Sequence, residues 1–150
     1  MSEDRYRLSP VRDQRSRDER VRRGDLAAAV GDARATEGQV ATAAARVTAA
    51  RAALAAARGA WAALAARAAG AGATAAALVV AERFVDRRRA ELDAAIDGHL
   101  RADAAHRGQL DQVAAARGRL ALARAEREVI ERHFAQWRTE RRKLAERRED

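Results

Sequence analysis

Gly70-Ala71-Gly72-Ala73-Thr74 decides the fold, because it is the one strong helix break after Pro10. Glycine can end a helix in the left-handed conformation, and threonine can cap the start of the next. Pro10 is the only proline, and Ser9 before it is a typical N-cap residue. These signals predict one helix over about residues 9–69, a turn over about 70–74 and a second helix over about 74–147.

Apolar residues repeat every seven positions in both predicted helices, each with a companion three residues later. In the first half the repeat comprises Leu26, Ala33, Val40, Val47, Leu54, Trp61 and Ala68, with Ala29, Thr36, Ala43, Ala50, Ala57 and Leu64. In the second half it comprises Val85, Leu92, His99, His106, Val113, Leu120 and Phe134, with Ala95, Ala102, Gln109, Ala116, Ala123, Ile130, Trp137 and Leu144. We call each such line of apolar residues a seam; a seam with this seven-residue repeat is typical of a coiled coil.

A turn between two such seams predicts an all-α fold, a long antiparallel two-helix coiled-coil hairpin that forms a single domain over residues 1–150. Folding about Gly72 would place His106 near Val40 and Leu120 near Leu26. A dimer of two extended chains would satisfy the same pattern, so the seams leave the oligomeric state open.

The composition favours long helices over a globular core. Of the 150 residues, 48% are hydrophobic and only 3% are aromatic. Thirty basic and 22 acidic residues give a net charge of +8, which leaves a basic coiled coil that binds nucleic acid as an alternative. Interleaved acidic residues and a single tyrosine argue against that partner. The start lacks an apolar leader, and residues 60–81 contain few large apolar side chains, so we expect a soluble cytoplasmic protein.

The sequence contains none of the common catalytic or ligand-binding patterns. Without cysteine there is no disulfide or thiolate metal site. His99 and His106 are seven residues apart, whereas two metal ligands on one helix are usually four apart. We therefore interpret these histidines as polar insertions in the seam. Phosphate-binding and nucleophile motifs are also missing, and we expect no enzyme activity, cofactor, metal or small-molecule substrate.

Three glycines, Gly24, Gly31 and Gly38, repeat by seven on the predicted outer face of the first helix. Each costs about 1 kcal/mol relative to alanine inside a helix. These glycines are either a surface without side chains against which a partner packs closely, or neutral substitutions in an exposed helix. We favour neutral substitution.

Charged residues gather at both ends of the chain, which a hairpin would bring together. The N-terminal end contains Tyr6-x-Leu8-x-x-Val11-x-x-x-Arg15. The C-terminal end contains Glu126-Arg-Glu-Val-Ile-Glu-Arg-His-Phe-Ala-Gln-Trp137, followed by a run of arginine and glutamate to Asp150. In these segments the chain resembles the FliJ/YscO family, the central stalk proteins of flagellar and virulence type III secretion systems.

The resemblance implies a fold like the coiled coil of the rotary ATPase gamma subunit. It also implies that the terminal end enters the pore of a hexameric export ATPase. Further implied partners are the export gate membrane protein and export chaperones, with a location in the cytoplasm, peripheral to the inner membrane. The candidates for ordering the ATPase end, by position, are Tyr6, Leu8, Val11, Arg15, Phe134 and Trp137. Trp137 has a second expected role, which is packing in the seam. For the whole protein, the alternative to a secretion stalk is a structural rod in another assembly.

Overall fold

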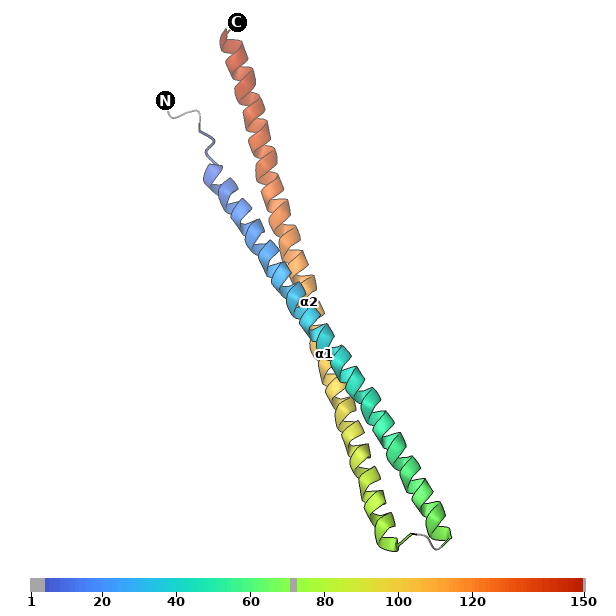
Figure 1. The fold of residues 1–150 in the computed structure, drawn as a ribbon. Coiled ribbons are helices and arrows are strands. Elements are labelled where there is room, and N and C mark those ends of the chain that lie inside the picture. The colour runs from blue at the N-terminus through green and yellow to red at the C-terminus, as the bar shows by residue number, and fades with distance from the viewer. Residues whose placement is uncertain (1–4, 71–72, 150) are drawn as a thin grey trace. The chain divides into compact units, whose positions relative to one another are not determined.

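Two long α-helices make up most of the chain in the computed structural model, which describes residues 5–70 and 73–149 (Figure 1). Helix α1 covers Ser9–Ala69 and helix α2 covers Ala75–Glu149. They pack against each other as an all-α helical hairpin, and the described residues contain no strand. The predicted fold class is thus confirmed. The bounds of α1 match the prediction, while α2 begins one residue later and ends two residues later than expected.

The start of each helix follows from its first hydrogen bonds. The Ala77 N–H donates to Oγ1 of Thr74 at 3.3 Å, so Thr74 caps α2 as predicted. At α1, the Arg12 N–H donates to the carbonyl of Leu8 at 2.9 Å, which makes Leu8 the N-cap residue. Ser9 and Pro10 are therefore the first and second helical residues, one position further in than predicted. Proline is tolerated there because the first four N–H groups have no intrahelical acceptor.

The end of α1 differs from the expected glycine cap. The Gly70 N–H donates to the carbonyl of Arg67 at 3.0 Å, a three-residue turn that tightens the end of the helix. Gly70 does not adopt the left-handed conformation. Gly72, the other glycine of the predicted turn, lies outside the described residues.

Contacts divide the chain into two units. The terminal unit comprises Met1–Asp32 and Leu110–Asp150, of which 5–32 and 110–149 are described, and the turn unit comprises Ala33–Gln109. In both units a segment of α1 lies beside a segment of α2 (Figure 1). Buried apolar residues of the terminal unit are Tyr6, Val113, Ala116, Leu120 and Ala123, and those of the turn unit are Ala33, Val47, Leu54 and Ala57.

All of these buried apolar residues except Tyr6 belong to the predicted seams. Every seam residue of α1 is buried or half-buried except Trp61, which is 41% exposed. Every seam residue of α2 is buried or half-buried except Leu144, which is 48% exposed. Because alanine buries few methylene groups, the larger buried residues contribute most, about 1.5–3 kcal/mol for each fully buried valine or leucine.

Two polar seam residues of the turn unit, Thr36 and His106, contact each other. Thr36 Oγ1 lies 2.9 Å from Nδ1 of His106 and also donates to the carbonyl of Ala33. Both side chains are half-buried, where an unpaired polar group would cost about 1–3 kcal/mol. The sequence register places His106 near Val40. In the structure His106 contacts Thr36 instead, which lies one helical turn earlier on α1.

By length and composition alone, α1 is apolar enough to cross a membrane, with a mean hydropathy of 1.2 over its most apolar window. Alanine dominates that helix and only 17% of the window is buried, so the helix meets this criterion by length and composition alone. We therefore infer no membrane span from it.

Candidate interaction site in the terminal unit

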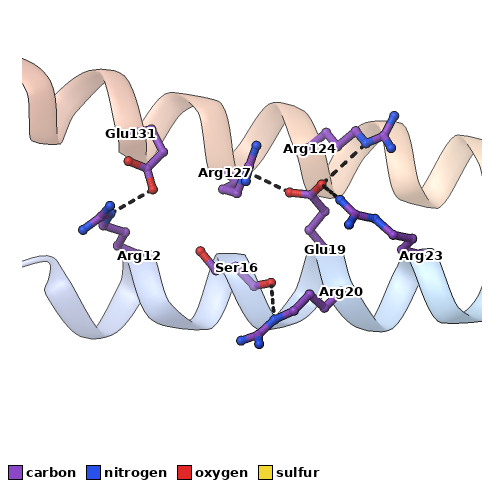
Figure 2. Close-up of polar contacts among 8 residues, drawn as sticks. All are labelled: Arg12, Ser16, Glu19, Arg20, Arg23, Arg124, Arg127 and Glu131. Carbon is purple, nitrogen blue, oxygen red and sulfur yellow. Dashed lines mark hydrogen bonds and ion pairs between the residues drawn. The ribbon is translucent and has the colours of Figure 1, made fainter.

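A buried carboxylate lies at the centre of the terminal unit (Figure 2). Glu19 on α1 is 3% exposed and is surrounded by three arginines. Its Oε1 lies 2.9 Å from Arg23 and 3.6 Å from Arg124, and its Oε2 lies 2.8 Å from Nε of Arg127. The Arg127 Nε–H is not directed at that oxygen, so their contact is electrostatic rather than a well-formed hydrogen bond. The carboxylate of Glu19 on α1 thus forms ion pairs with Arg124 and Arg127 on α2. With three arginines around one carboxylate, this Glu19 cluster has a net positive charge.

Two further cross-helix ion pairs extend from this cluster toward the start of α1. The Arg12 Nε–H donates to Oε1 of Glu131 at 2.8 Å (Figure 2), and Arg15 Nη1 donates to Oε2 of Glu126 at 2.7 Å. The hydrogen bond with Glu131 raises the pKa of Arg12 above its ordinary value. Both pairs are part exposed, so solvent screening keeps their contribution to stability small. Their main effect is to fix the register of the two helices.

Aromatic rings join the segment before α1 to the C-terminal part of α2. Tyr6 is 6% exposed and lies 5.0 Å from Phe134 and 5.3 Å from Trp137, measured between ring centroids. Its hydroxyl lies 2.8 Å from Nδ1 of His133. The guanidinium of Arg12 stacks 4.3 Å above the Phe134 ring, a cation–π contact. This ring cluster, Tyr6, His133, Phe134 and Trp137, holds the N-terminal segment on α2.

Helix α2 continues past the ring cluster as an exposed segment. Residues 138–148 are exposed except for half-buried Arg141. The sequence of 138–149 has six basic and three acidic residues, a difference of +3. Leu144, 48% exposed, is the one large apolar side chain among them. The cationic segment, as we call residues 138–149, thus presents a polar surface with a modest positive charge.

The six candidate residues from the sequence all lie in the terminal unit but in different surroundings. Tyr6, Phe134 and Trp137 meet in the ring cluster. Arg15 pairs with Glu126 and, at 3.8 Å, with Asp18. Half-buried Leu8 supplies the N-cap carbonyl, and Val11 is 39% exposed. Their joint role at an ATPase stays a prediction.

The Glu19 cluster is the feature that the sequence reasoning overlooked, although a signal for it exists. Glu19 is seven residues before Leu26, and Arg127 is seven residues after Leu120. Both seams therefore continue into charged residues in the terminal unit. Opposite charges at facing seam positions are a pattern that extending the heptads in both directions would have detected.

The grooves of the molecule are open surface features. Grooves of about 270, 510 and 460 Å³ lie in the turn unit. One of about 150 Å³ lies in the cationic segment and the residues before it. Within residues 5–70 and 73–149, no three histidine, cysteine or acidic side chains come close enough to hold a metal ion.

Comparison with protein-family models, with curated proteins and with solved structures gives no match.

Proposed function

We propose that this protein is a non-enzymatic central stalk or scaffold of a type III secretion export apparatus. In this proposal the terminal unit binds the hexameric export ATPase, and the chain links that ATPase to the export gate membrane protein. Export chaperones are further candidate partners, and the protein acts in the cytoplasm, peripheral to the inner membrane. The resemblance of the Tyr6 and Trp137 segments to the FliJ/YscO family supports this proposal.

One structural observation carries the proposal furthest: the N-terminal segment is fastened to α2 just before the cationic segment begins. Tyr6 packs against Phe134 and Trp137, and the exposed basic side chains follow directly in α2. The two family-like segments thus form one continuous surface in the terminal unit. Edge-on and tilted ring contacts of Tyr6 hold the N-terminal segment on α2, so less ordering entropy is lost when a partner binds.

The charge of this surface indicates the chemistry of its partner. Ion pairs already engage Arg12 and Arg15 with Glu131 and Glu126, whereas Arg142 and Lys143 are exposed on the cationic segment. These two cations are available for acidic side chains around the entrance of an ATPase pore. Such complementarity contributes orientation and association rate more than affinity.

The experiment that tests the proposal measures ATP hydrolysis and hexamer formation of the cognate export ATPase with the full chain added. We expect the wild-type chain to stimulate hydrolysis and to promote assembly. Reversing two charges with Arg142→Glu and Lys143→Glu should weaken this effect at least about tenfold, because like charges then face each other.

A matched control reverses two exposed arginines of the turn unit, Arg34→Glu and Arg46→Glu, with the same change in net charge. This control should stimulate like the wild type. If the wild-type chain leaves hydrolysis and assembly unchanged, the stalk proposal is wrong. Tight binding to a generic DNA duplex with a steep salt dependence would instead support a basic coiled coil that binds nucleic acid.

A further inference from the structure

One side of the turn unit exposes large apolar side chains that the hairpin leaves without cover. A groove of about 460 Å³ is lined by residues that include Arg58, Trp61 and Asp86. A second groove of about 270 Å³ is lined by residues that include Arg51 and Leu100. Trp61 is 41% exposed and Leu100 is 61% exposed.

The two grooves lie on the same side of the unit. On α1, Arg51 lines one groove and Arg58 the other, and these arginines are seven residues apart. On α2, Leu100 and Asp86 are fourteen residues apart and also line one groove each. Residues at multiples of seven share a face of a helix that packs in a coiled coil. We call this surface, with both grooves, the Trp61 face.

Charge is divided between the two edges of the Trp61 face. The α1 edge carries Arg51 and Arg58, and no carboxylate lies within ion-pair distance of either among the described residues. The α2 edge carries Asp86 and, seven residues later, Asp93. Within the part of the chain that the structure describes, the only ion pair of Asp86 is a 3.9 Å contact with Arg89 of its own helix. Glu82 and Arg89 of α2 line the same groove as Asp86. The α2 edge is therefore acidic by net charge, with three carboxylates against one arginine, whereas the α1 edge is basic.

We propose that the Trp61 face packs against the same face of a second copy of this chain. A twofold axis along the helices places α1 of one copy on α2 of the other, so that basic edges meet acidic edges. Arg51 then faces Asp93 of the second copy, and Arg58 faces its Asp86. Trp61 and Leu100 fill the space between the hairpins, and the result is a four-helix arrangement.

Charge also selects this arrangement over the alternatives. A twofold axis across the helices would place arginine opposite arginine, and like charges facing each other suppress association. A uniformly acidic partner would repel Asp86 and Asp93. A uniformly basic partner would repel Arg51 and Arg58. A second copy satisfies both edges with one surface.

Sedimentation of the full chain over a range of concentrations tests this inference with two charge-reversed variants. The first variant combines Arg51→Glu with Arg58→Glu, and the second combines Asp86→Arg with Asp93→Arg. We expect the wild type to form a dimer and each variant alone to dissociate at least about tenfold more readily. An equal mixture of the two variants should recover the dimer, because every reversed edge then meets its opposite.

The matched control reverses two charges outside the Trp61 face, with Arg46→Glu and Arg87→Glu, and should sediment as the wild type does. Circular dichroism verifies that each variant keeps its helix content. A wild-type chain that stays monomeric at all concentrations overturns the inference. So does a dimer that persists in both variants, or a mixture that fails to associate although each variant is folded.

Discussion

Glu19 is the residue whose surroundings contribute most to the structure of the terminal unit. A carboxylate that is 3% exposed has lost nearly all of its water, and that loss costs several kcal/mol unless cations replace it. Arg124 and Arg127 on α2, with Arg23 on α1, supply that replacement. The three arginine side chains remain 42–62% exposed, although Nε of Arg127 is itself buried. A single buried anion thereby joins the two helices.

Glu19→Gln should destabilise the protein by about 1–3 kcal/mol, since it removes the charge that three arginines share and leaves them repelling one another. Chemical unfolding followed by circular dichroism measures the change. Glu126→Gln is the matched control, because that carboxylate is 50% exposed and pairs with Arg15. Its loss should cost less than about 1 kcal/mol. Equal losses in the two variants would contradict a special role for the buried position.

At the scale of the elements, α1 carries helix-weakening residues with no packing role. A Cβ atom built on Gly24, Gly31 or Gly38 would meet nothing within 4 Å. All three are exposed, as the heptad pattern predicts for the outer face of the helix. Glycine lowers helix stability through the freedom of the unfolded backbone, and here no close contact requires it.

Replacing Gly24, Gly31 and Gly38 together with alanine should raise the free energy of unfolding by about 1.5–3 kcal/mol, because each change removes backbone freedom from the unfolded chain. Thermal unfolding, followed by the helix signal in circular dichroism, measures this increase in the free energy of unfolding. Substituting Ala28→Gly, also exposed on α1, should lower stability by about 1 kcal/mol as the reverse control. A triple variant that is more stable but loses a partner would show that these glycines form a contact surface. A less stable triple variant would contradict the open environment.

At the scale of the whole molecule, charged contacts and rings gather in the terminal unit, whereas the turn unit combines an alanine-rich seam with open grooves. Glu19, Arg12 and Arg15 join the helices of the terminal unit by ion pairs. Among the described residues of the turn unit, ion pairs form only within α2. The two units thus offer different surfaces, and we propose that one binds an ATPase and the other a second copy of the chain.

Deleting residues 142–150 separates folding from the proposed function. Residues 142–148 are exposed, so their removal should change the free energy of unfolding by about 0.5 kcal/mol or less. Stimulation of the export ATPase should be lost, since Arg142 and Lys143 are removed. Full-length chain with Glu140→Gln and Glu146→Gln is the control and should keep stimulation, because it gains positive charge. Undiminished stimulation by the truncated chain would exclude the cationic segment as the contact.

Much of the fold follows directly from local sequence. The helix of 61 residues, the break at Gly70 and the cap at Thr74 depend on backbone preferences and hydrogen bonds within a few residues. The seam positions follow from the heptad repeat, because the period of a helix determines which residues share a face. Both kinds of information are present in a single segment of chain.

The pairing of particular residues was decided only by the tertiary structure. Seam positions recur every three or four residues, which is about one turn, so a shift of one turn still buries both seams. His106 contacts Thr36 although the sequence register places it near Val40. Tyr6 reaches His133 across 127 positions of sequence, and Glu19 meets Arg127 from the other helix. Periodicity determines which face of a helix is buried, but choosing its partner depends on how charges, rings and side-chain volumes fit once two distant segments lie side by side.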